Sequence, residues 1–421
     1  MLGFRSGATA AAPPNLSIQR NFAAVFAGNA VFAAAQWASL SLVARLGGGE
    51  MLGQYALAVA IVSPVALFAH LNLRAVLATD IQRAHPFGDY MAVRMGTTAA
   101  GLAVILGLAL LSGHGWPVAP AIVLAGVVLS ADHFSDICYG ALQRRERMDQ
   151  VARSTVARGA LALAAMGAAL WISHSLLWAL AAQAVARIGV FLIYDRPAAA
   201  VHESPHRSGF AAQAAILRAA LPLGVVLMLL TLSGNLPRYA IERHMGTVAL
   251  GVFAAVASFQ TIGASVINPL GQTMTPRLAR AFSQGNRPLF LRLAAQLTGA
   301  ACLLGAAGVA VALTAGRLAL GVAYGPAFAN YGGLLVWMMA AGILGYAGSA
   351  LGYVITAARA FDSQAPLFLA VALVSAAASW VLVPKLGLEG AALALALAWL
   401  AQIAGELLIL RRALRRGERR P

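Results

Sequence analysis

The chain consists largely of apolar runs about 20 residues long, which is the length an α-helix needs to cross a bilayer. Because lipid offers no hydrogen bonds to the backbone, such runs must form helices. We therefore predict an all-α integral membrane protein with about 12 transmembrane helices. The predicted spans are residues 21–44, 51–77, 91–111, 118–139, 151–172, 176–194, 214–236, 248–270, 289–313, 331–356, 364–383 and 390–410.

The composition agrees with a membrane protein and disfavours other classes. Charged residues make up 10% of the chain and hydrophobic residues 60%, whereas soluble domains are roughly 25% charged. Cys138 and Cys302 stand far apart in apolar runs and fit neither a disulfide framework nor a zinc spacing. The chain has no Gly-rich nucleotide loop and no nucleophile elbow. We expect no enzyme activity, no cofactor and no metal.

The distribution of basic residues predicts the orientation of the chain. If the N-terminus is cytoplasmic, the alternation of loops places 25 of the 30 Lys and Arg residues on the cytoplasmic side, as the positive-inside rule requires. Residues 1–20 lack the apolar core of a secretory signal peptide. We therefore expect both termini to be cytoplasmic, and the charges to serve topology rather than a nucleic-acid partner. The five exceptions are Arg45, Arg238, Arg243, Arg317 and Lys385.

A short polar stretch between the first two predicted spans returns later in the chain. "ARLGGGEMLGQYALA" (Ala44–Ala58) is followed 198 residues later by "ERHMGTVALGVFAAV" (Glu242–Val256) in the same frame. The matching residues are Arg45, Gly53 and Tyr55 in the first copy and Arg243, Gly251 and Phe253 in the second. Glycines permit a tight reversal, so each copy is predicted to be the outer corner of a helical hairpin whose charged residues stay in water or headgroups.

The repeat predicts how the chain is organised. Six predicted spans lie between the copies, so both corners cross the membrane in the same direction, and such parallel repeats place the substrate site between them. The polar segment between spans six and seven reads as a linker. The predicted parts are a cytoplasmic N-terminal segment 1–20, a six-helix bundle 21–194, a cytoplasmic linker 195–213, a second six-helix bundle 214–410 and a basic cytoplasmic tail 411–421.

Three motifs resemble one known family. The corner at 44–58 is similar to the Arg-Leu-Gly…Gly-x-Tyr-x-Leu-Ala signature of bacterial polysaccharide flippases, the Wzx-like branch of the multidrug/oligosaccharidyl-lipid/polysaccharide exporter superfamily. "YGALQRRERM" (Tyr139–Met148) resembles the Leu-Gln-x-x-x-Arg-Met pattern found there, and "GYVITAARAFD" (Gly352–Asp362) is its counterpart in the second half. This chain has Gly48-Gly49 where the family often has Gly-Pro.

The resemblance implies a fold and a cargo. It implies two parallel six-helix bundles around a central cavity that opens alternately to either side of the bacterial cytoplasmic (inner) membrane. The implied cargo is a polyprenyl-pyrophosphate-linked oligosaccharide moved to the outer leaflet for O-antigen, capsule or exopolysaccharide synthesis. Implied partners are membrane lipids, a proton or sodium ion, and the polysaccharide polymerase and chain-length machinery. The alternatives are a multidrug/cation antiporter of the same superfamily and a membrane-bound glycosyltransferase or polymerase.

Charges inside the predicted spans are the candidate site. Arginine can hold phosphate oxygens bidentately and stays charged when partly desolvated, and Arg158 and Arg187 each lie about eight residues inside a span, roughly 12 Å deep. Asp132 and Asp136 are four residues apart and share a helix face. We hypothesise that these aspartates pair with Arg158 or Arg187 and take part in proton or cation coupling. The alternative is a purely structural ion pair.

Further polar residues are candidates for headgroup binding. Arg74 ends the second span with His70 one turn before it, and is either a headgroup ligand at the cytoplasmic mouth or an ordinary positive-inside residue. In the second half the comparable substrate-binding candidates are Asn235 and Arg238. All of them can equally bridge helices.

Two other features receive structural interpretations. Glu406 lies near Arg411, and we predict a local ion pair between them. His202 and His206 are four apart, but Pro205 between them disfavours a helix that presents both to a metal.

Overall fold

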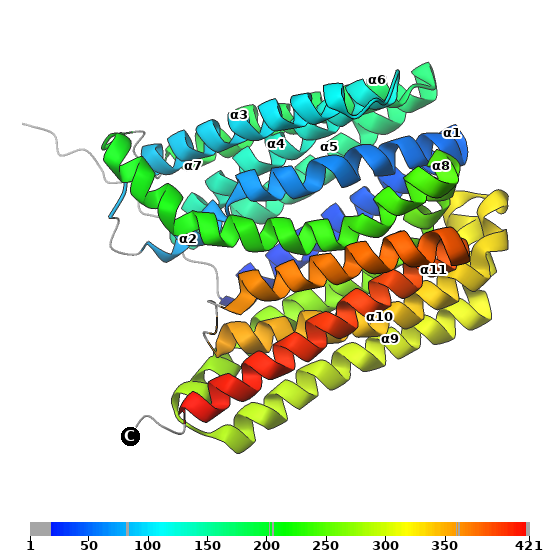
Figure 1. The fold of residues 1–421 in the computed structure, drawn as a ribbon. Helices are drawn as coiled ribbons and strands as arrows, with labels where there is room; N and C mark the ends of the chain where they lie inside the picture. The colour runs from blue at the N-terminus through cyan, green and yellow to red at the C-terminus, as the bar shows by residue number, and fades with distance from the viewer. Residues whose placement is uncertain are drawn as a thin grey trace, which may run out of the picture.

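The computed structural model describes residues 18–80, 84–201, 203, 206–358, 360 and 363–417, and this part is helical without strands (Figure 1). Nine of its helices are long and apolar enough to cross a membrane, so the chain is a multi-pass membrane protein. Residues 1–17, His202 and 418–421 lie outside the described part. The helices are α1 Ile18–His70, α2 Leu73–Thr79, α3 Phe87–Leu111, α4 Val118–Arg144, α5 Met148–Ser173, α6 Leu176–Val190, η1 Phe191–Asp195, α7 Arg196–Ala200, α8 Phe210–Ser283, α9 Arg287–Tyr324, η2 Pro326–Tyr331, α10 Gly332–Ala357 and α11 Gln364–Gly417.

Three long helices are broken at a glycine with a left-handed backbone. The φ angles are 68° at Gly48 in α1, 83° at Gly246 in α8 and 61° at Gly387 in α11. Glycine adopts such angles without a Cβ clash. Figure 1 shows α11 running to one end of the molecule and returning beside itself. Gly48 and Gly246 are 198 residues apart, so both predicted corners break at the same point of the repeat.

The breaks explain how nine helices relate to the predicted spans. Each break falls between two predicted spans, at the junctions 44/51, 236/248 and 383/390. Together the three breaks divide the nine described helices into twelve segments. The number of membrane crossings itself stays a prediction. One span differs from expectation: the helix over 51–77 stops at His70, because Leu71 and Asn72 have φ angles of 52° and 48°, and resumes as α2.

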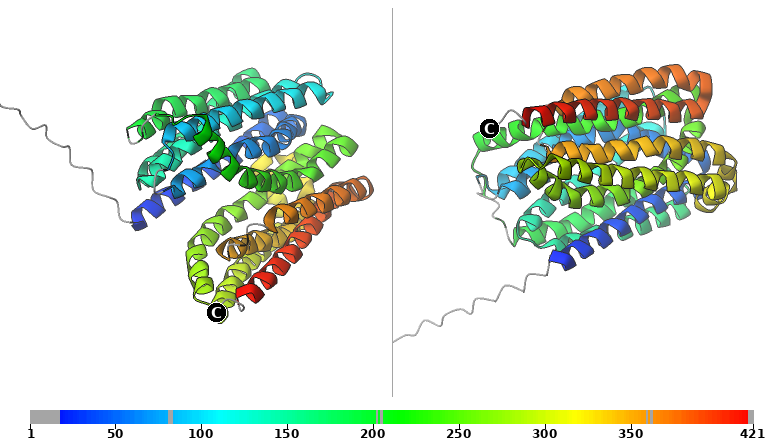
Figure 2. Two further views of the ribbon diagram at one scale, coloured as in Figure 1. Left: turned by 60° about the vertical axis from the view of Figure 1, so that its left-hand side comes forward. Right: turned by 90° about the horizontal axis from the view of Figure 1, so that it is seen from below.

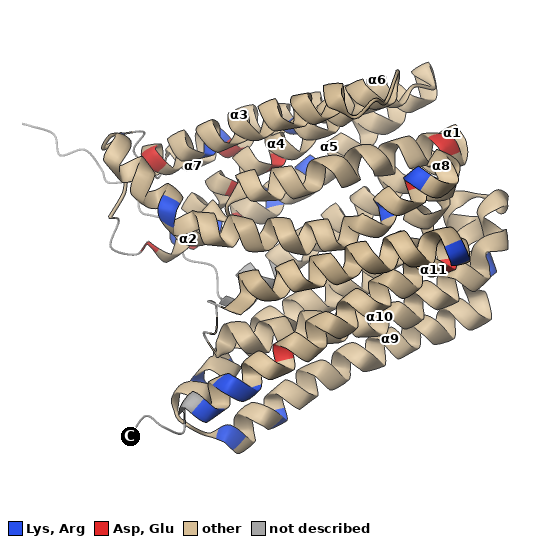
Figure 3. Cartoon of the chain, in the orientation of Figure 1, with Lys and Arg blue, Asp and Glu red and all other residues tan. Residues whose placement is uncertain are grey.

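The packing forms two groups of helices (Figure 2). One group, here called the N-terminal bundle, contains α1 to α7, and the C-terminal bundle contains α8 to α11. Their largest common hydrophobic core surrounds the broken corners: Leu52 and Leu57 of α1 pack in it with Leu250 and Phe253 of α8 and Leu395 of α11. Charged residues lie mostly toward the two ends of the helices (Figure 3).

The segment between the bundles is held against the N-terminal bundle. The sixth span extends beyond residue 194, through η1 and α7. Arg144 Nη2 lies 2.6 Å from Glu203 Oε2, and both side chains are buried. Asp89, fully buried at the start of α3, accepts a hydrogen bond of 3.0 Å from the amide of Ser208. These contacts attach the described part of the linker before α8 begins.

Candidate functional site

A buried ion-pair cluster joins three helices of the N-terminal bundle. Asp132 of α4 lies between Arg158 of α5 and Arg187 of α6. Its Oδ1 is 3.5 Å from Arg158 Nη1, and its Oδ2 pairs with Arg187 Nη1. The side chains of Arg158 and Arg187 are only 9% and 4% exposed. The structure thus brings together one of the predicted aspartates and both predicted arginines.

Asp136 has partners that differ from those predicted. Its Oδ2 lies 2.9 Å from Nε2 of His70, and its Oδ1 accepts a hydrogen bond of 3.3 Å from Nη1 of Arg74. Arg74 also donates through Nε to Gln143 Oε1 at 3.1 Å. The expectation that Asp136 pairs with Arg158 or Arg187 is therefore corrected, because one helical turn moves it toward the end of α1 and the start of α2.

Aromatic rings complete the surroundings of these arginines. The guanidinium carbon of Arg158 lies 4.7 Å from the ring centre of Phe32 and 5.4 Å from that of Tyr139. Arg187 lies 5.8 Å from Phe32, and Arg74 lies 5.6 Å from Tyr139. A cation over an aromatic face is attracted by the ring quadrupole. These contacts hold the guanidinium groups without neutralising them.

Arg94 is a buried cation that sequence reasoning missed. Its side chain on α3 is 0% exposed, and its Nη1 donates to the carbonyl of Ala69 at 3.3 Å, while Nε and Nη2 have no partner among the described residues. The sequence feature that could have identified Arg94 is its position four residues inside a predicted span, where a charged side chain is unusual. The ring of His133 of α4 lies beside that of His70, with ring centres 4.8 Å apart and the planes tilted by 59°.

The charges of this part of the bundle are predominantly positive. A third carboxyl, Asp195, is 0% exposed and lies beside Ser135 and Ser154 in the field of Arg158. Four arginines thus face three aspartates, with two histidines beside them. The cluster consists of Arg74, Arg94, Arg158, Arg187, Asp132, Asp136, Asp195, His70 and His133.

Asn235 and Arg238 make contacts elsewhere. Arg238 Nη1 donates to Asn235 Oδ1, and Asn235 Nδ2 donates to Ser63 Oγ at 2.9 Å. The neighbouring Tyr239 hydroxyl donates to the carbonyl of Ala60 at 2.6 Å. These side chains join α8 to α1, one bundle to the other, and the described contacts do not connect them to the Asp132 cluster.

The two corner repeats cross each other at glycines. A Cβ on Gly53 would lie 1.9 Å from the carbonyl oxygen of Thr247, and a Cβ on Gly251 would lie 2.0 Å from the carbonyl oxygen of Gly49. Gly49 and Thr247 are 198 residues apart, as are Gly53 and Gly251. The repeat therefore makes one close contact twice, and only glycine fits at either position.

Arg45 is exposed, as predicted for the corner charges, and it also contacts the other bundle. Its Nε donates to the carbonyl of Ala323 at 3.1 Å, and its Nη2 to that of Val322. Both carbonyls belong to the last turn of α9, which a cation stabilises. Arg243, the corresponding residue of the second copy, is exposed. The adjacent Glu242 pairs instead with His114 at 3.2 Å.

We expect Arg45→Ala to weaken the contact between bundles. Losing two hydrogen bonds to the end of α9 should lower the free energy of unfolding by roughly 1 kcal/mol. Arg243→Ala is the matched control, because it removes the corresponding exposed arginine. Thermal unfolding in detergent measures both, and equal melting temperatures for the two variants would contradict this role of Arg45.

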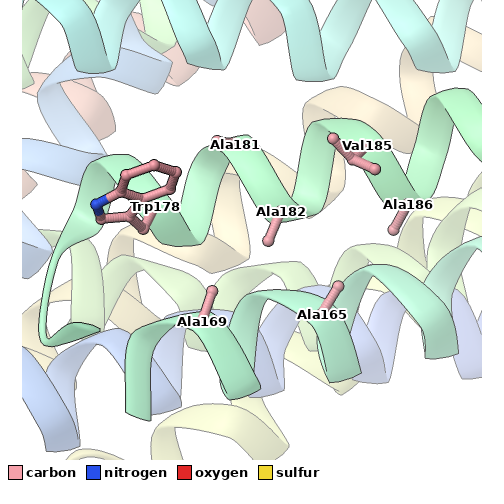
Figure 4. A pocket seen from close by; sticks show the side chains of 7 residues that line it. All are labelled: Ala165, Ala169, Trp178, Ala181, Ala182, Val185 and Ala186. Atoms are coloured by element: carbon pink, nitrogen blue, oxygen red, sulfur yellow. The ribbon is translucent and has the colours of Figure 1, made fainter. Parts of the chain in front are cut away.

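A groove on the outside of the N-terminal bundle is unsuited to a charged headgroup (Figure 4). It lies between α5 and α6, where Trp178 and Val185 are 67% and 71% exposed. All of its lining side chains are apolar apart from the indole nitrogen of Trp178, and they fit contact with lipid chains. They are Ala165, Ala169, Trp178, Ala181, Ala182, Val185 and Ala186.

A match over most of the chain decides its family. Residues 18–282 match the family model described as "Polysaccharide biosynthesis protein". The chain belongs to this family. Within the polysaccharide biosynthesis protein family, the capsular polysaccharide biosynthesis protein CapF of Staphylococcus aureus is similar: it is 23% identical over 377 residues, which are 89% of this chain and 94% of CapF.

Solved structures show the same fold. An inward-facing multidrug resistance MATE family transporter of the MOP superfamily has a TM-score of 0.67 at 14% identity and covers 95% of this chain and 96% of its own. An outward-facing multidrug resistance MATE family transporter has a TM-score of 0.65 at 15% identity. A MOP superfamily transporter from Pyrococcus furiosus has 0.66 at 15% identity, and both matches cover 96% of each chain. The resemblance to Wzx-like flippases is confirmed by the family match, and the all-α fold is the one found in these solved transporters.

Proposed function

We propose that the chain is a flippase that moves a polyprenyl-pyrophosphate-linked oligosaccharide from the cytoplasmic to the outer leaflet. The observation that carries this proposal is the buried arginine cluster, where Arg74, Arg94, Arg158 and Arg187 outnumber the aspartates beside them. Charges deep in a membrane bundle are costly and mark pathways for polar cargo. Guanidinium groups suit pyrophosphate, because their fork geometry matches phosphate oxygens.

The alternative, a multidrug/cation antiporter, is disfavoured by the same cluster. A site for organic cations needs acidic groups that are not already neutralised. Asp132 is paired with Arg158 and Arg187, and Asp136 with His70 and Arg74. Neither carboxylate is available to a second cation while these pairs persist. The enzymatic alternative has no support from the fold, which is that of transporters.

Alternating access, with the two bundles as the moving parts, is the proposed mechanism. The bundles share their main core at the corner end, where the glycine crossings lie. The core that contains Ile267, Phe290 and Leu410 belongs to the C-terminal bundle alone, and the one that contains Tyr139 and Val151 to the N-terminal bundle alone. A further core joins the bundles at the opposite end, where Ile216 and Ala220 of α8 pack with Leu73 of α2 and Tyr90 of α3. The proposed moving parts are the two six-helix bundles, residues 21–194 and 214–410.

The first experiment is flipping of a fluorescent polyprenyl-pyrophosphate oligosaccharide in proteoliposomes, with efflux of a cationic dye measured in parallel. The flippase is expected to move the lipid and not the dye. Movement of the dye alone would overturn the proposal in favour of the antiporter. Addition of soluble pyrophosphate is expected to compete with the lipid, because both would bind the same arginines.

A further inference from the structure

A carboxyl of the C-terminal bundle lies apart from every cation described. Glu406 of α11 is 1% exposed. Its Oε1 accepts a hydrogen bond of 3.0 Å from Nε2 of Gln402, one turn earlier, and its Oε2 has no partner among the described residues. Arg411, the predicted partner, is exposed and forms no ion pair in this part of the chain. The expected local pair is therefore corrected.

The neighbouring elements place no compensating charge beside Glu406. On α10 two glycines face this pair: a Cβ on Gly348 would lie 3.2 Å from Gln402 Nε2, and one on Gly352 would lie 3.6 Å from Glu406 Oε1. The titratable groups of α10 at this level are two tyrosines. The hydroxyl of Tyr346 donates to the carbonyl of Gln260, and that of Tyr353 to Asn268.

The basic residues on the other elements point away from this site. Within the first segment of α11, Leu367 packs against Gly405 beside the acid. The arginines of α8, α9 and α11 nearest this end of the bundle are all exposed. They are Arg277, Arg280, Arg287, Arg292, Arg411, Arg412 and Arg415.

An ionised carboxylate in such a place would be expensive. A buried charge without a partner costs several kcal/mol, and a carboxyl avoids that cost by taking up a proton. Asp132 and Asp136 of the N-terminal bundle differ, because ion pairs with arginine stabilise their charged form. Asp132 pairs with two arginines, and Asp136 pairs with Arg74 and is hydrogen-bonded to His70. Their charge is therefore compensated without a proton, and that of Glu406 is not.

We propose that Glu406, hydrogen-bonded by Gln402, is a proton-binding site of the C-terminal bundle and holds its proton in this conformation. Resting on the proposed flippase, the inference extends to coupling: Glu406, in place of Asp132 or Asp136, carries the proton that drives transport. The side chain binds and releases one proton, and no covalent step is involved. An amide neighbour fits this task, since Gln402 can donate to the carboxyl or accept from it.

Infrared spectroscopy tests the proton site without any transport. Wild-type protein reconstituted in lipid at neutral pH is expected to show the C=O stretch of a protonated carboxylic acid, and Glu406→Gln to lose that band. The matched control is Glu389→Gln, which changes an exposed acid of the same helix. A wild-type spectrum in which Glu406→Gln removes only a carboxylate band would overturn the proposal. The glutamine imitates the protonated acid in shape, so the variant is expected to fold.

Flipping under a pH gradient tests the coupling. A gradient is expected to accelerate wild type and the Glu389→Gln control, while Glu406→Gln flips at one rate with or without it. If the pH gradient still accelerates flipping by Glu406→Gln, Glu406 is not the residue that couples the proton to transport. Acceleration by sodium at equal pH, lost in Glu406→Gln, would assign the site to sodium instead. If wild type does not flip the lipid at all, the flippase proposal fails, whereas the infrared result still decides the proton site.

Discussion

Gly53→Ala is expected to abolish flipping, although alanine is the better helix former by about 1 kcal/mol. The added Cβ would lie 1.9 Å from the carbonyl oxygen of Thr247, and a backbone atom has no alternative rotamer to adopt. The corner ends of the bundles must move apart, which disrupts their shared core. Overpacking of this kind costs about 1–3 kcal/mol. We expect at least a tenfold loss of flipping, measured in proteoliposomes, and a lower melting temperature.

The second copy of the corner repeat offers an equivalent variant to Gly53→Ala, and a glycine elsewhere in the chain offers a control. Gly251→Ala should have the same effect, since its Cβ would lie 2.0 Å from the carbonyl oxygen of Gly49. Gly107→Ala changes a helical glycine of α3 with no atom within 4 Å of the added Cβ, and should flip lipid like wild type. Wild-type activity in Gly53→Ala would show that the corner contact is dispensable for transport.

Arg187→Ala is the second variant for which we expect a large effect. Removing one member of a buried ion pair costs about 3–5 kcal/mol, because the remaining charge loses its partner. The side chain of Arg187 is 4% exposed, and Asp132 would retain only the 3.5 Å contact with Arg158. We expect reduced stability in thermal unfolding and at least tenfold weaker competition by pyrophosphate in the flipping assay.

A double variant separates stability from headgroup binding. Arg187→Ala with Asp132→Ala removes both charges, so no unpaired carboxylate is created by the loss of Arg187. Stability should recover in part, while competition by pyrophosphate stays weak if Arg187 binds the headgroup. Recovery of both properties would contradict the binding role and leave the pair purely structural. Arg187→Lys adds a further comparison, because lysine keeps the charge and loses the bidentate fork.

The lengths of the apolar runs and the glycines between them were enough to predict most helices and corners, because every span must satisfy its own backbone hydrogen bonds in lipid. Among the predicted side-chain partners, the pairing of Asp132 with Arg158 and Arg187 is confirmed. The predicted partners were wrong where a helix break intervened. The positive φ angles at Leu71 and Asn72 redirect the chain, and this break brings His70 and Arg74 to Asp136.

Other features had weak or no sequence signals. Phe32 is one of many apolar residues in α1, and nothing in its neighbourhood along the chain marks it as the ring beneath Arg158. Glu406 was expected to pair with Arg411, yet the helix points that arginine outward and leaves the acid with Gln402. Spacing along a helix defines which residues share a face but not which neighbouring helix that face meets.

The sequence by itself determined the class of protein, the helical segments, the corner repeat and the family, since lipid requires each span to satisfy its own backbone. Only the tertiary structure decided that the repeats cross at Gly53 and Gly251, and that Arg45 reaches the end of α9. It likewise decided which buried charges are compensated. The physical reason is that the charge state and role of a buried side chain depend on partners from helices far apart in the chain, which local spacing does not encode.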